Sequence, residues 1–440
     1  MRTVKESRLT LRSLLAVAVV GIIASREGNA QALSDSARVA GWRSDITYYL
    51  GQMKQRHYVY RDHPLPPALI EAASHLAQNV SSYSDERMLA EFEYLASFGG
   101  DGHTYILPFA ARRVTAHMLP LRMFQFGDGL YVIDAFQGYE KWIGAQVLRV
   151  GNTPANVVLN RMRPTLSADN RFTYLWVAPA LLSFRGFLEK FADGIDSGDV
   201  ALTLRPHGGA TLRARIPTVV APPMRGIPKL PASKLTGAPA PPLYLSNVGE
   251  NFWFRDLSNG VLYFQFNQVM DSPQESLASF AQRFATHVRE SSPSAIIVDV
   301  RHNNGGNLML LPPLMAAFRE YESTNRRGQI YVLMGRNTFS AAQFFLGLMD
   351  SQTRAIFAGE PSSSKPNFVG EESEVVLPWS GGIGSISDEY HETIPGDHRE
   401  WIKPDISYVL KSSDYFENRD PLLEMVMADI AKKLREKPKA

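Results

Sequence analysis

Two short polar segments come directly after predicted buried strands in the last third of the chain. The apolar run 295–300 is followed by the adjacent Gly305 and Gly306, and the run 329–334 is followed by Ser340 and a helical pattern. Adjacent glycines let backbone N–H groups approach a ligand closely and form an anion nest. A serine at a strand-to-helix junction has free helix N–H groups beside it, which favour a developing oxyanion. These residues could perform nucleophilic acyl transfer, although a serine at this position is also a common helix N-cap.

The elements around these segments alternate between strand and helix. Apolar runs of strand length lie at 260–267, 295–300, 329–334 and 355–359. Helical patterns lie between them, at 276–290, 308–321 and 341–349. This alternation predicts a parallel α/β core, in which sites collect at the carboxyl ends of the strands. We therefore expect the glycine pair and Ser340 at one edge of the same sheet.

Three regions precede this core. Residues 36–98 show helical spacing of apolar side chains with a break at Pro64–Pro67, which predicts a small group of helices. From about 114 to 220 the pattern changes to short strands, with a hairpin signal at Gly151-Asn152. A helical insertion is expected near 174–191. The proline-rich stretch 221–242 predicts an extended connector.

The N-terminal stretch has the order of a secretory signal peptide. Basic residues are followed by an apolar run over 14–24 and by small residues that end in Ala30-Gln31-Ala32. The run is shorter than the roughly 20 residues of a membrane span, so we expect cleavage after Ala30 or Ala32 and no stable membrane insertion afterwards. This predicts export to the periplasm or the medium.

Composition excludes several kinds of site and partner. The chain has no cysteine, which excludes a thiol nucleophile, disulfides and Cys-based zinc sites. Its net charge is +2 and it shows no basic stripe, so a nucleic-acid partner is not expected.

Several ordered motifs resemble one family. The segments 297–306 and 338–342 look like the signature of the C-terminal-processing and tricorn-core serine peptidase family. Further motifs match in order: Gly102-His103-Thr104, Gly359-Glu360, Lys365-Pro366-Asn367, Leu377-Pro378 to Ser380-Gly381, Pro404-Asp405-Ile406 and Arg419-Asp420-Pro421-Leu422-Leu423. The resemblance covers most of the chain after the leader.

This resemblance implies a fold and a set of domains. It implies an α/β catalytic core of the ClpP/crotonase-like kind, a parallel sheet with helices, together with a small β-rich PDZ-like module and an N-terminal helical cap. The expected boundaries are a signal peptide at 1–32, the helical region at 33–113, the PDZ-like module at 114–220, a Pro-rich linker at 221–250 and the serine peptidase domain at 251–440.

The resemblance also implies roles for single residues. Ser340 is the expected nucleophile, and the N–H groups of Ala341 and of Gly305 or Gly306 are the expected oxyanion hole. The activity it implies is hydrolysis of peptide bonds in a peptide or protein substrate, with no metal and no other cofactor. The oligomeric state is left open.

Two residues fit the general base that a serine hydroxyl needs. Lys365 lies 25 positions after Ser340 and resembles the lysine of the processing-peptidase branch, although a solvated loop lysine would look the same. His103 resembles the histidine of the tricorn branch and is the favoured candidate, although that branch has a serine where this chain has Gly102.

A carboxylate is expected to support the histidine. Glu400 is the candidate for this role, with Glu371 or Glu372 as weaker alternatives. His302, beside the glycine loop, is a rival base that we expect to face substrate or to be structural.

Two other classes of protein compete with a peptidase. The first is a ligand-binding protein on the same fold, similar to lipid or retinoid carriers in which the catalytic residues are degraded. The second is an esterase of the α/β-hydrolase class, but no Gly-x-Ser-x-Gly elbow surrounds Ser340.

Overall fold

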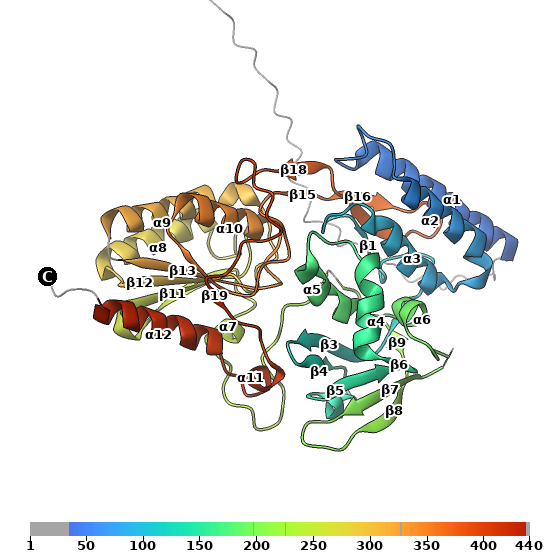
Figure 1. The fold of residues 1–440 in the computed structure, drawn as a ribbon, viewed down its shortest axis with the longest axis horizontal. Helices are drawn as coiled ribbons and strands as arrows, with labels where there is room; N and C mark the ends of the chain where they lie inside the picture. The colour runs from blue at the N-terminus through green and yellow to red at the C-terminus, as the bar shows by residue number, and fades with distance from the viewer. Residues whose placement is uncertain (1–34, 197, 225, 326–327, 437–440) are drawn as a thin grey trace, which may run out of the picture.

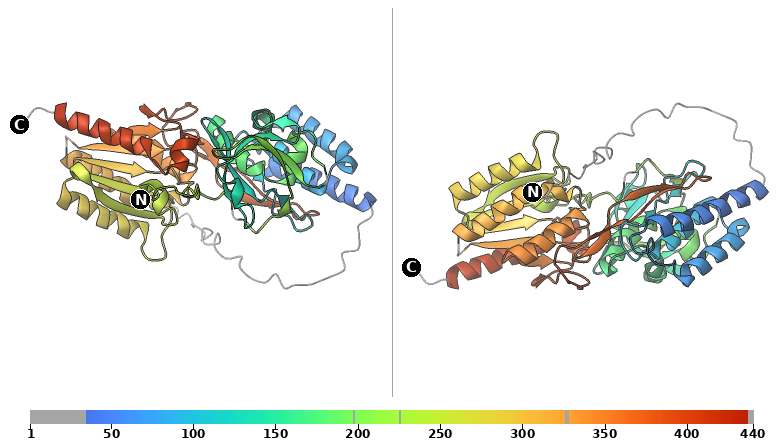
Figure 2. Two further views of the ribbon diagram at one scale, coloured as in Figure 1. Left: turned by 90° about the horizontal axis from the view of Figure 1, so that it is seen from below. Right: turned by 90° about the horizontal axis from the view of Figure 1, so that it is seen from above.

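The computed structural model describes residues 35–196, 198–224, 226–325 and 328–436. The expected signal peptide lies outside the described residues. Within the described ranges, no helix is both long enough and apolar enough to cross a membrane. Figures 1 and 2 show two lobes: the α/β core lies on one side, and the β module and the N-terminal helices lie together on the other.

The core is one six-stranded sheet in the order β10-β11-β12-β13-β14-β19. Its strands are β10 (Phe252–Leu257), β11 (Val261–Phe266), β12 (Ala295–Asp299), β13 (Gln329–Met334), β14 (Ile356–Gly359) and β19 (Ile406–Ser407). β10 is antiparallel to β11, and the remaining pairs are parallel. The predicted parallel α/β core is therefore present, with an antiparallel edge strand added before it.

Alternating side chains of the core sheet face two layers of helices. Phe264 and Val298 pack in one cluster with the helices α8 (Leu277–Ser291), α9 (Pro312–Thr324) and α10 (Ala341–Gln352). Tyr263 and Ile297, one residue away in each strand, pack in another cluster with α12 (Pro421–Glu436). The sheet is thus buried on both faces, as parallel sheets require.

The β module is an antiparallel sheet in the order β3-β4-β5-β7-β8. Its strands are β3 (Leu121–Phe126), β4 (Gly129–Ala135), β5 (Gln146–Val150), β7 (Val200–Arg205) and β8 (Leu212–Ile216), with β6 (Thr153–Pro154) paired to β5. The helices α4 (Ala155–Met162), α5 (Arg171–Leu181) and α6 (Arg185–Phe191) pack on it. The Gly151 hairpin is confirmed, whereas α4 was not predicted, because a pattern of eight residues does not distinguish a helix from a strand.

Three helices form the N-terminal region, namely α1 (Asp35–Arg56), α2 (Pro67–Asn79) and α3 (Asp85–Ser97). Their core also contains side chains of β16 (Ser373–Val376) and β17 (Ile383–Ile386), which form a small sheet with β1 (Tyr105–Ile106). Trp42 of α1 packs against Trp379 of the β16–β17 turn, with ring centroids 5.2 Å apart. The C-terminal part of the chain therefore crosses from the core lobe to complete the other lobe.

The remaining elements are short. They are β2 (His117–Met118) paired with β9 (Val219–Val220), β15 (Phe368–Gly370) paired with β18 (Glu389–His391), α7 (Leu243–Ser246), α11 (Ser412–Phe416), and the 3-10 turns η1 (Val80–Ser82), η2 (Glu140–Trp142), η3 (Arg163–Thr165), η4 (Ser258–Gly260) and η5 (Leu308–Leu310).

Candidate active site

The glycine segment and the Ser340 segment lie together at the carboxyl ends of β12 and β13. The two strands are parallel neighbours, and hydrogen bonds join the loops that follow them. The Thr338 hydroxyl donates to the Val300 carbonyl at 2.9 Å, and the Phe339 N–H donates to the Asn303 carbonyl at 3.0 Å. The sequence prediction that these segments share one sheet edge is confirmed.

Ser340 has an unusual backbone conformation. Its φ is 57° and its ψ is −126° at the N-cap position of α10, and its side chain makes no capping hydrogen bond. A positive φ is uncommon for a residue with a side chain and is retained only where the surroundings impose it. The N-cap interpretation accounts for the position of Ser340 but gives no role to its hydroxyl.

Gly305 lies directly against the Ser340 turn. A Cβ on Gly305 would be 2.7 Å from the Ser340 Cβ and 3.0 Å from the Ala341 nitrogen. Its φ of 107° is also in the region that favours glycine. Only glycine therefore allows the two backbone segments to approach this closely.

The two glycines differ in what their N–H groups do. The Gly305 N–H donates to the Asn303 side chain at 3.0 Å. The Gly305 carbonyl accepts from the Val269 N–H at 2.9 Å, which fixes the loop from the other side. Because the Gly305 N–H is already engaged, Gly306 is the better suited of the two to donate to an oxyanion, together with Ala341 at the start of α10.

His103 lies next to the Ser340 turn, between two aromatic rings. It stacks on Phe339, the residue before Ser340, at a centroid distance of 4.3 Å, and on Phe368 at 5.6 Å. Within the described ranges, neither ring nitrogen has a hydrogen-bond partner, and the residue is 2% exposed. Burial lowers the pKa of His103 to about 4, against the opposing charge of Asp101. The imidazole is therefore neutral at neutral pH.

Asp101 holds the turn that carries His103. One carboxylate oxygen accepts from the N–H groups of His103 and Thr104 at 2.8 and 2.7 Å and from the Ser387 hydroxyl at 2.6 Å. The other oxygen lies 3.0 Å from His57 Nε2. These hydrogen bonds outweigh burial and lower the pKa of Asp101. Neither Asp101 nor His57 was predicted from the sequence as part of the site, although an Asp two residues before the histidine is a typical Asx-turn signal.

The glycine that replaces the expected serine at position 102 has a steric reason. A Cβ on Gly102 would lie 2.7 Å from the Phe339 ring and 3.3 Å from Asp169 Oδ2. The ring of Phe339 therefore occupies the space that a side chain at this position would need.

Lys365 and Glu400 lie in a neighbouring polar cavity of about 260 Å³, which Asp101 and Asp169 also line. Burial raises the pKa of Asp169 to about 8, while the charge of Lys365 acts in the opposite direction. The Glu400 backbone is fixed, since its carbonyl accepts from the Asn170 side chain at 3.0 Å.

No hydrogen bond joins Lys365 or the Glu400 carboxylate to Ser340 or His103 in the described part of the chain. Both side chains therefore lie beside the site that the sequence predicts, but neither is hydrogen-bonded to its serine or its histidine.

The alternative carboxylates have other partners. Glu371 Oε1 is 3.7 Å from His391 Nε2, and Glu372 accepts from the Tyr105 hydroxyl at 3.1 Å.

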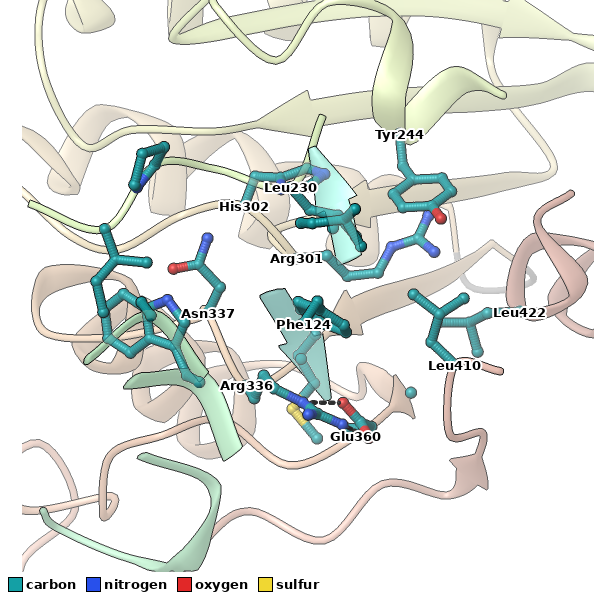
Figure 3. Close-up of a pocket in the computed structure, with 18 of the residues that line it drawn as sticks. Phe124, Leu230, Tyr244, Arg301, His302, Arg336, Asn337, Glu360, Leu410 and Leu422 are labelled. Carbon is teal, nitrogen blue, oxygen red and sulfur yellow. Dashed lines mark hydrogen bonds and ion pairs between the residues drawn. The ribbon is translucent and has the colours of Figure 1, made fainter. Parts of the chain in front are cut away.

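His302 belongs to a different cavity. It stacks on Tyr244 at a centroid distance of 5.8 Å and lines the space drawn in Figure 3. Burial lowers the pKa of His302 to about 4.

The β module helps to position the loops around Ser340. Asn170, the N-cap of α5, donates to the carbonyl of Ser362 at 3.2 Å as well as to that of Glu400. The Thr173 hydroxyl donates to the Ser363 carbonyl at 2.8 Å. The Ser363 N–H in turn donates to the Thr338 carbonyl at 3.1 Å, two residues before Ser340. Contacts thus run from α5 to the Ser340 turn.

Comparison with known proteins supports the fold. No family model matches the sequence, and no curated protein shows significant sequence similarity. Among solved structures, mature CPAF complexed with lactacystin matches with a TM-score of 0.63 and 14% identity, covering 91% of this chain and 100% of that chain. A serine-to-alanine mutant of CPAF matches with a TM-score of 0.64 and 13% identity, covering 92% and 99%.

A partial match is also found to the tricorn protease, with a TM-score of 0.40 and 13% identity, covering 90% of this chain and 37% of that chain. The CPAF structures, which are of the C-terminal-processing peptidase type, confirm at the level of fold the resemblance stated from the motifs.

Proposed function

We propose that this chain is a serine peptidase that hydrolyses peptide bonds through an acyl-enzyme on Ser340. One observation carries the proposal: Ser340 has a positive φ at the start of α10, with Gly305 packed against it so closely that only glycine fits. Strained nucleophile turns of this kind expose a hydroxyl beside free N–H groups. The fold shared with CPAF supports the same reading.

In the proposed reaction, the Ser340 hydroxyl attacks the carbonyl carbon of a peptide bond, and its proton passes to the His103 imidazole. The N–H groups of Gly306 and Ala341 donate to the oxyanion. His103 then protonates the leaving amine, and the acyl group stays on Ser340. A water molecule then loses a proton to His103 and attacks the ester carbonyl; the bond to Ser340 Oγ breaks, His103 returns the proton to Oγ, and the acid is released.

His103 is the favoured base over Lys365. Its ring stacks on Phe339, next to Ser340, and it is neutral because burial lowers its pKa to about 4. Lys365 lines the polar cavity with Asp169 instead, where it balances acidic charge. In this account Glu400 supports the site from the same cavity and does not contact the base directly.

Two finer features belong to the same proposal. The basic, apolar and small-residue order of the leader supports export, with the mature chain in the periplasm or the medium. The β module at 114–220 is proposed to resemble a PDZ domain and to present an extended peptide to the site by pairing it with a sheet edge. The helices at the N-terminus act as a cap on that lobe.

The test is proteolysis of an unfolded protein by the purified mature chain. Casein is incubated with the wild type and with Ser340→Ala and Ser363→Ala, and new termini are identified by mass spectrometry. We expect new termini with the wild type and with Ser363→Ala, whose hydroxyl makes only a 3.4 Å contact to Thr338. Equal cleavage by Ser340→Ala would refute the proposal, and absence of cleavage by the wild type would favour the ligand-binding alternative.

A further inference from the structure

A second cavity lies at the carboxyl edge of the core sheet, where it meets the β module. Its volume is about 100 Å³, the same order as the roughly 150 Å³ cavity that holds benzene in an engineered protein. Phe124 and Trp176 come from the module, Leu230 from the linker, and Leu410 and Leu422 from the C-terminal segment. Figure 3 shows Phe124, Leu230, Leu410 and Leu422 around the space. The walls are mainly apolar and come from three parts of the chain.

Three side chains on this wall have buried polar atoms without a hydrogen-bond partner in the described ranges. They are His302, at both ring nitrogens, Tyr244, at its hydroxyl, and Asn337, at its amide oxygen; His302 and Tyr244 are each 3% exposed. A buried polar group without a hydrogen bond is unfavourable because it has lost its contact with water. Such groups are normally satisfied by water or by a ligand. The neutral imidazole offers one donor and one acceptor, and the phenol offers both.

Each charged side chain around the cavity already has a partner. They are the cations Arg122, Arg301, Arg336 and Lys229 and the anions Asp299, Asp420 and Glu360. Arg301 is held between its two carboxylates at 2.5 and 2.8 Å, and Arg336 and Glu360 are 2.6 Å apart. Arg122 and Lys229 donate to backbone carbonyls instead. Every charged side chain here thus already has a protein partner, and an uncharged occupant leaves these contacts intact.

We propose that this cavity binds an uncharged, single-ring aromatic group with one hydrogen-bonding substituent, such as a phenol. The ring would lie among the apolar walls, and its polar substituent would hydrogen-bond Tyr244 or His302. Two sources share this chemistry: a free small molecule, or an aromatic side chain of a peptide bound at Ser340. Only the second source rests on the proposed peptidase function.

The test measures binding of phenol and of benzene by isothermal titration calorimetry and ligand-observed NMR. Tyr244→Phe keeps the ring and removes the hydroxyl, so phenol binding should weaken about 2- to 10-fold, as expected for one hydrogen bond, while benzene binding is unchanged. Ala180→Leu fills the cavity from α5 and should weaken both ligands more than tenfold. Should Ala180→Leu fail to fold, Leu230→Trp fills the same space from the linker.

Binding itself decides the proposal without any enzyme assay. Wild-type protein that binds neither ligand, or filled variants that bind both as well as the wild type does, would overturn it. Peptide hydrolysis in the presence of phenol then separates the two sources. An increase in KM alone identifies a pocket for a substrate side chain, and a change in kcat alone identifies a site for a free ligand. A chain that binds phenol but cleaves nothing would refute the peptidase proposal and leave the cavity assigned to a free ligand.

Discussion

Ser340 and Gly305 depend on each other because their backbones are in direct contact. We predict that Gly305→Ala lowers fluorophosphonate labelling of Ser340 by about 100-fold, because it would displace the neighbouring Ala341 N–H, and loss of one oxyanion donor costs about this much. The added methyl would come within 2.7 Å of the Ser340 Cβ and must displace the turn. Intact-mass spectrometry over time measures the rate. Gly249→Ala is the control, since its methyl meets no atom within 4 Å; equal rates in both variants would contradict the prediction.

The pH dependence of labelling tests His103 as the base. Burial lowers the pKa of His103 to about 4, so its neutral, proton-accepting form is present above that pH and is lost as the pH falls through it. We expect a labelling rate that is flat from about pH 5 to about pH 8 and decreases below pH 5. A rate that climbs throughout this range would contradict a histidine base with this pKa.

At this scale the sequence identifies single residues better than their contacts. Ser340, His103 and the glycine pair stand in recognisable motifs, and the structure brings all four together. The residues that hold these four in place do not belong to recognisable motifs. Asp101 supports His103 through residues as distant as His57 and Ser387, and no local pattern connects these positions. The contact between Phe339 and Gly102 is not predictable from the sequence either. Only the fold shows that the Phe339 ring leaves no room for a side chain at position 102.

The helix α1 shows how one element is fixed by a distant one. A Cβ on Gly41 would lie 2.3 Å from the Trp379 ring, whereas a Cβ on Gly51 of the same helix would meet no atom within 4 Å. We predict that Gly41→Ala lowers the free energy of unfolding by about 1–3 kcal/mol through overpacking. Gly51→Ala should raise it by up to about 1 kcal/mol, since alanine is the better helix former. Urea denaturation measures both, and a stabilised Gly41→Ala would contradict the packing.

The elements of the core were predictable because their pattern is local. The strand 329–334 was placed without error, and the neighbouring strands were placed to within a residue or two, because buried runs and amphipathic helices differ in period. The pairing of β17 with β1 was not predictable. It joins residues almost 280 positions apart, as in Tyr105 with Ser385, and short strands carry too little periodicity to show their partner.

At the scale of the whole molecule, α5 of the β module is connected to the Ser340 turn. We predict that Asn170→Ala slows Ser340 labelling by about 10-fold or more, because it removes the amide that holds the carbonyls of Ser362 and Glu400. It also removes the N-cap of α5, which costs about 1 kcal/mol.

Ser84→Ala is the matched control for this loss of stability. Ser84 is the N-cap of α3, so its removal should lower the melting temperature by a similar amount without slowing labelling. Labelling that slows equally in both variants would show a general loss of stability and would contradict a specific link between α5 and the site.

The proposed function requires above all that Ser340 is an activated nucleophile. Purified mature protein is treated with a fluorophosphonate, and the wild type, Ser340→Ala and His103→Ala are compared by intact mass and by mapping of the labelled peptide. We predict a single adduct on Ser340 in the wild type, none in Ser340→Ala, and strongly slowed labelling in His103→Ala. An adduct of the same mass and rate in Ser340→Ala would contradict the account.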